Sequence, residues 1–233
     1  ILSGKTLATN PHIKEPSKEE LNSLIYLYNQ KKLQQVYREA QILTKRYTKN
    51  LALWNLIGAS AAQLGKLDEA VLAFKKALSI KPDDAQAHYN LGNVIKNQGK
   101  LEEAMETYKK ALSIKPDYAE AYLNMGNVLK DQDKLEEAID AYNIALSIKP
   151  DYADAYVNMG NVLTDQEKLE EALEAYNSAL STEPDNAEAY YNMGNVFKDQ
   201  EKLEEALKAY NNALSIKPDY ADAYVNMGNV LTD

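Results

Sequence analysis

Asparagines recur along the chain in two regular series, and amides spaced in this way could bind another polypeptide. The first series is Asn90, Asn124, Asn158, Asn192 and Asn226, and the second is Asn93, Asn127, Asn161, Asn195 and Asn229. Each carboxamide offers two N–H donors and a carbonyl acceptor. A row of them can hydrogen-bond the N–H and C=O groups of an extended peptide without requiring particular side chains. Some of these amides could instead satisfy only local backbone groups or water.

Other chemistry has no comparable pattern in the sequence, and we expect no catalytic residue, metal site or cofactor. Cysteine is absent, which excludes disulfides, zinc ribbons and thiol catalysis. His12 falls in a segment without periodicity, and His88 stands where related positions carry an aromatic, so it is interpreted as a packing substitute. The paired glutamates recur where acids favour a helix N-terminus: Glu102–Glu103, Glu136–Glu137, Glu170–Glu171 and Glu204–Glu205.

The asparagines belong to a longer repeat with a period of 34 residues. The same 21 residues occupy 145–165 and 213–233, which start 68 residues apart, or twice the period. Two other residue types recur in step: Pro82, Pro116, Pro150, Pro184 and Pro218, and Gly58, Gly92, Gly126, Gly160, Gly194 and Gly228. A fixed period of this length indicates an array of one supersecondary unit.

Each unit is predicted to be two helices. In 119–152, apolar and small residues follow a spacing of three and four on both sides of a polar stretch at 130–134. Glycine costs roughly 1 kcal/mol against alanine inside a helix, so Gly126 is expected to allow close approach of the second helix at Ala138. Four aspartates, each followed by an acid three residues on, are predicted to be capping boxes: Asp117/Glu120, Asp151/Asp154, Asp185/Glu188 and Asp219/Asp222.

These residues resemble the tetratricopeptide repeat, which has an aromatic at position 4, a large apolar residue at 7, Gly at 8, a large residue at 11, Ala at 20, an aromatic at 24, Ala at 27 and Pro at 32. In the unit that starts at Ala187 the matching residues are Tyr190, Met193, Gly194, Phe197, Ala206, Tyr210, Ala213 and Pro218. The resemblance implies an all-α solenoid, a right-handed superhelix of antiparallel helix pairs.

The repeat divides the chain into segments. Five repeats are expected at 51–84, 85–118, 119–152, 153–186 and 187–220. Segment 17–50 keeps the spacing but has Leu24 in place of Gly and Val36 in place of Ala, and is interpreted as a divergent capping repeat that begins with a capped helix at Ser17. Residues 1–16 are expected to be a mobile tail. Residues 221–233 are the first helix of a further repeat, and we interpret Asp233 as a cut in a longer array.

Repeats of this family present a concave groove lined by the first helices, so the groove is where the resemblance places function. Asparagines at position 6, the first series, resemble those that hold peptides in the O-linked N-acetylglucosamine transferase branch of the family. The predicted peptide-binding residues are Asn90, Asn124, Asn158, Asn192, Asn226, Asn93, Asn127, Asn161 and Asn195, with Tyr89 and Tyr191 at position 5. The lysines and arginine with which related co-chaperones grip a C-terminal carboxylate are missing, so that mode is disfavoured.

Charge indicates the kind of partner. Residues 1–50 carry nine Lys or Arg against four acids, whereas residues 51–233 carry 17 against 31. An acidic groove favours a neutral or basic protein or peptide, although many of these acids could be a solvated face. Nucleic acid is not expected, because no basic stripe spans the array. No apolar run is long enough for a membrane span, and a cytoplasmic location is expected.

The resulting hypothesis is a non-enzymatic interaction module that holds an extended peptide or protein segment in its groove. One alternative is the substrate-recognition arm of a larger enzyme, such as a glycosyltransferase, whose catalytic domain lies beyond residue 233. Another is a scaffold that self-associates through the ends of the solenoid, one basic and one acidic.

Overall fold

The structure, a computed structural model, describes residues 15–232, which form thirteen helices and no strand. Most of the segment expected to be a tail, and Asp233, lie outside the described residues. The chain divides into two compact units, residues 1–115 and 116–233. The prediction of an all-α fold made of helix pairs is confirmed within the described part of the chain.

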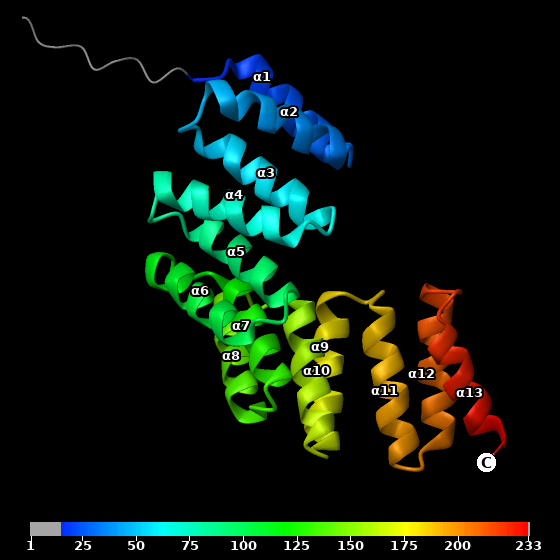
Figure 1. The fold of residues 1–233 in the computed structure, drawn as a ribbon. Helices are drawn as coiled ribbons and strands as arrows, with labels where there is room; N and C mark the ends of the chain where they lie inside the picture. The colour runs from blue at the N-terminus through cyan, green and yellow to red at the C-terminus, as the bar shows by residue number, and fades with distance from the viewer. Residues whose placement is uncertain (1–14, 233) are drawn as a thin grey trace, which may run out of the picture. The chain divides into compact units, whose positions relative to one another are not determined.

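Unit 1 contains α1 (Lys18–Asn29), α2 (Leu33–Arg46), α3 (Leu51–Gln63), α4 (Leu67–Ile80), α5 (Ala85–Asn97) and α6 (Leu101–Ile114) (Figure 1). Unit 2 contains α7 (Ala119–Asp131), α8 (Leu135–Ile148), α9 (Ala153–Asp165), α10 (Leu169–Thr182), α11 (Ala187–Asp199), α12 (Leu203–Ile216) and α13 (Ala221–Thr232). Within each unit every helix packs on the next one, and in unit 2 the first helices α7, α9, α11 and α13 also contact each other in that order. The asparagine series therefore lies on neighbouring helices.

The core of each repeat from 51–84 to 187–220 is an aromatic ring packed on a glycine, with Phe74 in the first of these repeats and a tyrosine in the other four. Tyr142 on α8 is fully buried, and a Cβ atom built on Gly126 would lie only 2.4 Å from its Cε1 atom. The nearest neighbour of Gly126 is thus the Tyr142 ring rather than Ala138, the predicted contact. Ala138 is itself fully buried. The glycine is required because an aromatic ring, and not only a second backbone, occupies the space beside it.

The divergent first helix pair reverses this arrangement of sizes. Leu24 stands at the glycine position of α1 and Ala40 stands at the tyrosine position of α2, and both side chains are buried. A large residue on the first helix thus goes with a small residue on the second. The predicted cap of this pair is confirmed, because Ser17 Oγ accepts from the Glu20 N–H at 3.1 Å and a Glu20 carboxylate oxygen accepts from the Ser17 N–H at 2.7 Å.

The capping boxes predicted at the later aspartates are wrong. Asp117, Asp151 and Asp185 each lie one residue before the N-cap, which is Tyr118, Tyr152 or Asn186. Neither Tyr118 nor Tyr152 caps its helix with a side-chain hydrogen bond. Asp219 likewise lies two residues before Ala221, where α13 begins. Two residues separate the proline from the first residue of the helix, whereas a capping box at the aspartate would require one.

The turn that joins the two helices of a pair needs one residue with left-handed backbone. Gly99 adopts φ 76°, its N–H donates to the Lys96 carbonyl at 2.8 Å, and the next N–H, of Lys100, donates to the Ile95 carbonyl at 3.2 Å. These two bonds end α5 in a Schellman motif. The later repeats place Asp133, Glu167 and Glu201 at this position with φ of 58–59°.

Replacing Glu167 with glycine should therefore stabilise the protein. A left-handed conformation costs a residue with a Cβ atom about 1 kcal/mol more than it costs glycine, so we expect Glu167→Gly to raise the free energy of unfolding by about 1 kcal/mol in urea denaturation. Gly99→Ala is the reverse control, and it should lose a similar amount although its Cβ would meet no atom within 4 Å. Unchanged stability in both variants would show that the turn does not carry this strain.

Candidate functional site

The second asparagine series holds the repeats together through its side-chain carbonyls. In each repeat the buried tyrosine donates its O–H to the asparagine Oδ1: Tyr108 to Asn93 at 2.7 Å, Tyr142 to Asn127 at 2.9 Å, Tyr176 to Asn161 at 2.8 Å and Tyr210 to Asn195 at 2.8 Å. Repeat 51–84 carries Phe74 and Ala59 at the two positions instead. Tyrosine and asparagine are thus present together or absent together.

The same carbonyls in unit 2 accept a second hydrogen bond, from the first series. Asn158 Nδ2 donates to Asn127 Oδ1 at 3.0 Å, Asn192 to Asn161 at 2.8 Å and Asn226 to Asn195 at 2.8 Å. Both lone-pair directions of each of these carbonyls are then used. We call this chain of tyrosines and asparagines the amide spine, and it links each repeat of unit 2 to the next.

The amide spine fixes how the first series is presented. Asn158, Asn192 and Asn226 are half-buried and use an N–H group to bond the preceding repeat. Their Oδ1 atoms accept no hydrogen bond from any residue that the structure describes. Asn226 also donates to the Tyr191 hydroxyl at 3.1 Å. The spine therefore sets the orientation of these three amides, each of which keeps a carbonyl oxygen that no described residue uses.

The remaining predicted residues are placed differently. Asn124 Oδ1 accepts from Asn127 Nδ2 at 3.5 Å in unit 2, and in unit 1 Asn90 Oδ1 accepts from Gln86 Nε2 at 3.0 Å. Tyr89 and Tyr191 both lie against the buried tyrosine of their repeat, with ring centroids 6.1 Å and 6.0 Å apart. The sequence favoured the first asparagine series as a whole, whereas within that series the carbonyls of Asn124 and Asn90 already accept a hydrogen bond.

A cavity of about 350 Å³ opens in unit 2 beside the spine. Four of the predicted residues line it, namely Asn161, Tyr191, Asn192 and Asn195. The other lining residues, which were not among the predicted peptide-binding residues, are Lys130, Thr164, Asp165, Tyr176, Glu188 and Tyr220. The rings of Tyr191 and Tyr220 lie against each other with centroids 4.9 Å apart and planes tilted by 36°. The joint presence of tyrosine at position 24 and asparagine at position 9 was the sequence signal that could have placed Tyr176 here.

Burial keeps the tyrosines of the spine protonated. It raises the pKa of Tyr176 and of Tyr210 to about 12, because the phenolate would lose hydration in the packed interior. Burial also raises the pKa of Tyr142, with a smaller contribution from the Asp131 carboxylate. The hydroxyls of Tyr176 and Tyr210 therefore remain donors, as the spine requires, at alkaline pH values where an exposed tyrosine would ionise.

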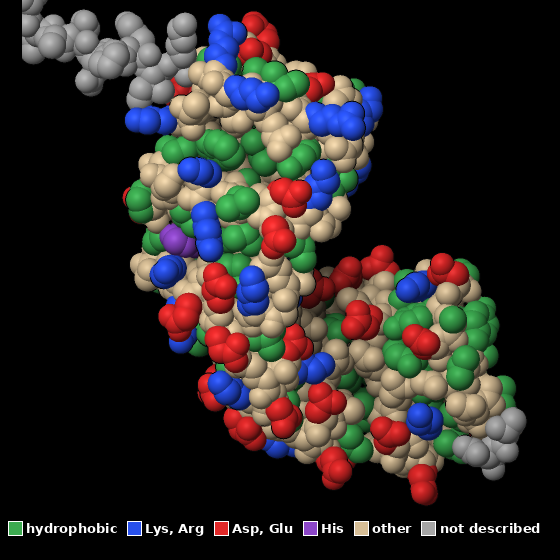
Figure 2. Space-filling view, viewed as in Figure 1, with side chains coloured by type: hydrophobic (Ala, Val, Ile, Leu, Met, Phe, Trp, Pro, Cys, Tyr) green, Lys and Arg blue, Asp and Glu red, His purple; other side chains and the backbone are tan. Residues whose placement is uncertain are grey.

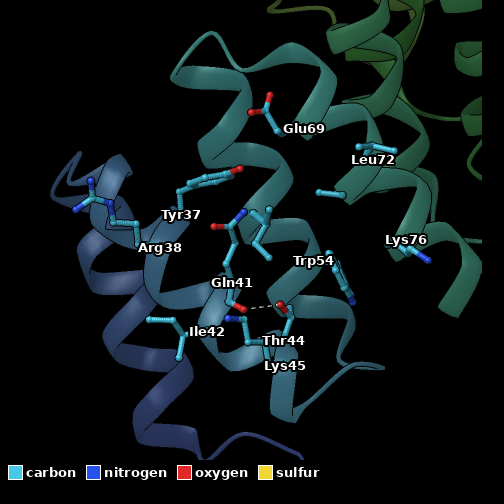
Figure 3. Close-up of a pocket in the computed structure, with 12 residues that line it drawn as sticks. Tyr37, Arg38, Gln41, Ile42, Thr44, Lys45, Trp54, Glu69, Leu72 and Lys76 are labelled. Atoms are coloured by element: carbon cyan, nitrogen blue, oxygen red, sulfur yellow. Dashed lines mark hydrogen bonds between the residues drawn. The ribbon is translucent and has the colours of Figure 1, made fainter.

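A second and larger cavity, of about 740 Å³, lies in unit 1 between α2, α3 and α4 (Figure 3). Apolar Ile42 and Leu72 on its walls are 63% and 65% exposed, and Arg38, Lys45 and Lys76 stand among its lining residues with Glu69 as the acid. Leu72 occupies a position that is Glu106, Asp140, Glu174 or Lys208 in the other repeats. Sequence reasoning missed this cavity, and it contains none of the predicted asparagines.

The two units differ in charge. Residues 1–115 carry 18 Lys and Arg against 11 Asp and Glu, and residues 116–233 carry 8 against 24. On the face drawn in Figure 2, basic side chains are the more frequent around α1–α4 and acidic ones elsewhere. The cavity beside the amide spine thus belongs to the acidic unit.

His88 takes the place of an aromatic residue, as predicted. Its Nε2 atom lies 2.9 Å from the Pro82 carbonyl oxygen, and in the preceding repeat Trp54 Nε1 donates to the Thr48 carbonyl at the same distance. Among the described residues no group of three or more His, Asp or Glu side chains is placed to hold a metal ion. None of the described helices is both long enough and apolar enough to cross a membrane.

Stacked helix pairs linked by the amide spine define a helical-repeat protein, a class that mediates interactions between proteins. A family model described as "TPR repeat" matches residues 58–99, 95–133, 126–165, 160–201 and 194–232. The chain belongs to this tetratricopeptide repeat family, and it is a protein-interaction module in the general sense of that family.

Comparisons with individual proteins agree with the family. A crystal structure of MamA is 30% identical, with a TM-score of 0.63, and the match covers 71% of this chain and 97% of that one. The structure of YrrB, described as "a TPR protein with an unusual peptide-binding site", is 23% identical with a TM-score of 0.60. The match covers 80% of this chain and 96% of that one, and it shows the fold alone. The peroxisomal targeting signal receptor of Candida albicans is 52% identical over 40 residues, and this match spans 17% of the chain and 7% of that receptor.

Proposed function

We propose that unit 2 binds an extended peptide or protein segment along its first helices. The observation that carries this proposal is the state of Asn158, Asn192 and Asn226, whose N–H groups are tied to the preceding repeat while their carbonyls accept nothing from the described residues. A half-buried acceptor without a partner favours a ligand that donates. Backbone N–H groups of an extended chain are such donors, and they occur at regular intervals.

The amide spine would reduce the conformational entropy that the asparagine side chains lose on binding. A free asparagine side chain loses rotamer freedom when it binds, at a cost of about 0.5–1.5 kcal/mol for an immobilised side chain. Asn192 is already held by its 2.8 Å bond to Asn161, which is itself held by Tyr176. The second asparagine series therefore has a positioning role in this proposal, and the first series makes the contacts.

The expected partner is a neutral or basic polypeptide. The 24 carboxylates of residues 116–233 against eight lysines would disfavour an acidic segment and speed the encounter with a basic one. YrrB, a protein with a similar fold, is described as having a peptide-binding site, and this supports the same use of the fold here.

The test is an affinity measurement with peptides selected from a random 13-residue display library. We expect Asn158→Ala, Asn192→Ala and Asn226→Ala together to weaken the selected peptides about 100-fold, since three hydrogen bonds of about 1 kcal/mol each are lost. Tyr108→Phe is the control, because it breaks the equivalent bond to Asn93 in unit 1 and lies outside unit 2, where the proposed contacts are. It should lose stability and leave the affinity within about twofold. Equal affinity of the triple variant, with its helicity unchanged, would contradict the proposal.

A further inference from the structure

The cavity beside the amide spine lies where one repeat lacks a lysine that both neighbouring repeats carry. Position 12 of the repeat is lysine in Lys96, Lys130 and Lys198, whereas it is Ala62 in repeat 51–84, Thr164 in repeat 153–186 and Thr232 in the last segment. Thr164 lines the cavity, and its hydroxyl donates to the Gly160 carbonyl at 2.9 Å, within its own helix. A smaller, uncharged residue thus replaces a long cationic side chain at this point of unit 2.

The fold itself shows what a cation does at this position. Lys130 Nζ lies 3.9 Å from a carboxylate oxygen of Asp165, which stands at position 13 of the next repeat. In this row, a lysine at position 12 of one repeat lies beside an aspartate at position 13 of the next. Because residue 164 is not a lysine, the row lacks one positive charge there. Repeat 153–186 holds one lysine, Lys168, and eight acids.

The walls of the cavity carry two carboxylates, those of Asp165 and Glu188, with which a basic side chain can pair. Glu188, at the first turn of α11, is exposed and forms no ion pair with a described residue. Both Asp165 and Glu188 act on Tyr176, and Glu188 and Asp222 act on Tyr220, where they add to the burial that raises the pKa of these tyrosines to about 12. Lys217 lies 4.5 Å from the Tyr220 ring centroid and does not line the cavity, so this ring already holds a cation nearby.

Aromatic and amide groups complete the site. Tyr191 lies between Tyr210 and Tyr220, and an aromatic ring attracts a cation over its face by about 0.5–1 kcal/mol at an exposed site. Asn192, with its open carbonyl, lines the same cavity. A ligand backbone on Asn192 could therefore place a side chain in the cavity.

We propose that this cavity binds an arginine or lysine side chain of the peptide held by the first asparagine series. The ligand's cation takes the place of the lysine that Thr164 replaces, pairs with Glu188 and lies against Tyr191. This inference rests on the proposed function, and it adds a sequence preference to a backbone contact that has none.

The test uses defined peptides rather than selected ones. Three fluorescein-labelled 13-residue peptides of Ala, Ser and Thr carry arginine, glutamine or glutamate at the centre, and anisotropy gives their affinities for the whole chain. We expect the arginine peptide to bind about tenfold tighter than the glutamine peptide, from one exposed ion pair and one cation–π contact. The glutamate peptide should bind weakest.

Two variants and a matched control locate the preference. Thr164→Lys restores the residue that three other repeats carry, so it should fold and should fill the cavity with a cation of its own. It and Glu188→Gln should each reduce the arginine preference below about threefold. Asp154→Asn is the control, because Asp154 stands at the same repeat position as Glu188, beside Val157 instead of a tyrosine, and it should keep the preference.

The outcomes separate this inference from the function on which it rests. Equal binding of the arginine and glutamine peptides, both lost in the triple asparagine variant, would overturn the basic subsite and leave the peptide groove standing. A preference that survives Thr164→Lys and Glu188→Gln would place the subsite elsewhere and overturn the inference. Failure of all three peptides to bind at 1 mM would overturn both.

Discussion

Alanine in place of Gly194 should lower the free energy of unfolding by about 2 kcal/mol, although alanine is the better helix former. A Cβ atom at this residue would lie 2.5 Å from the Cε1 atom of Tyr210, a ring that is fully buried. The ring packs in one core cluster with Leu214 of α12 and Ala223 of α13, so it can move away only by disturbing that packing. Overpacking of this kind typically costs 1–3 kcal/mol.

Gly228→Ala is the matched control for this prediction. Gly228 holds the same position in α13, but a Cβ atom there would meet nothing within 4 Å. The substitution should therefore stabilise the protein by up to about 1 kcal/mol through helix propensity alone. Chemical denaturation followed by circular dichroism measures both effects. Equal shifts in the two variants would mean that the glycine position is a matter of helix propensity and not of ring packing.

Removal of a carbonyl from the amide spine should have a similarly large effect. Asn127→Ala leaves the buried Tyr142 hydroxyl and an N–H of Asn158 without their acceptor. An unsatisfied buried polar group costs about 1–3 kcal/mol, so a loss of about 2 kcal/mol is expected in the same denaturation experiment.

The second substitution of a cycle tests the cause of this loss. Repeat 51–84 already combines Ala59 with Phe74, which is fully packed. Asn127→Ala with Tyr142→Phe reproduces that pair and removes the orphaned hydroxyl, so the double variant should recover about 1 kcal/mol relative to Asn127→Ala. Purely additive losses would show that the tyrosine and the asparagine do not stabilise the fold as a unit.

The period of 34 residues was enough to predict the helix pairs, because each pair repeats the same hydrophobic spacing and the same glycine. It also placed the asparagines on neighbouring first helices. Periodicity does not give the direction of a side chain, however, so it could not distinguish Asn161, whose carbonyl is saturated by Tyr176 and Asn192, from Asn192, whose carbonyl is open. That difference depends on two hydrogen bonds between helices, which join residues 15 and 31 positions apart in the sequence.

The errors have local physical causes. Asp117 has the residue type and the spacing of a cap. The turn after Pro116 is, however, one residue longer than a cap at Asp117 would require, so Tyr118 is the residue that precedes the helix. Gly126 was matched with another small residue, whereas size complementarity pairs it with Tyr142. The cavity was not predicted because it depends on what Thr164 lacks relative to Lys96, Lys130 and Lys198, and an absent side chain gives no motif.

The central claim is that the open carbonyls of Asn158, Asn192 and Asn226 accept backbone N–H groups. Packed helices lie about 8–10 Å apart, and an extended chain in the polyproline II form has three residues per turn and rises about 3.1 Å per residue, so one ligand residue in about three should meet an amide. The most direct measurement is the affinity of a selected peptide methylated at one backbone nitrogen at a time. We predict that binding weakens about tenfold at every third residue and that the pattern vanishes in the triple asparagine variant. A uniform effect along the peptide, or the same pattern in that variant, would contradict the account.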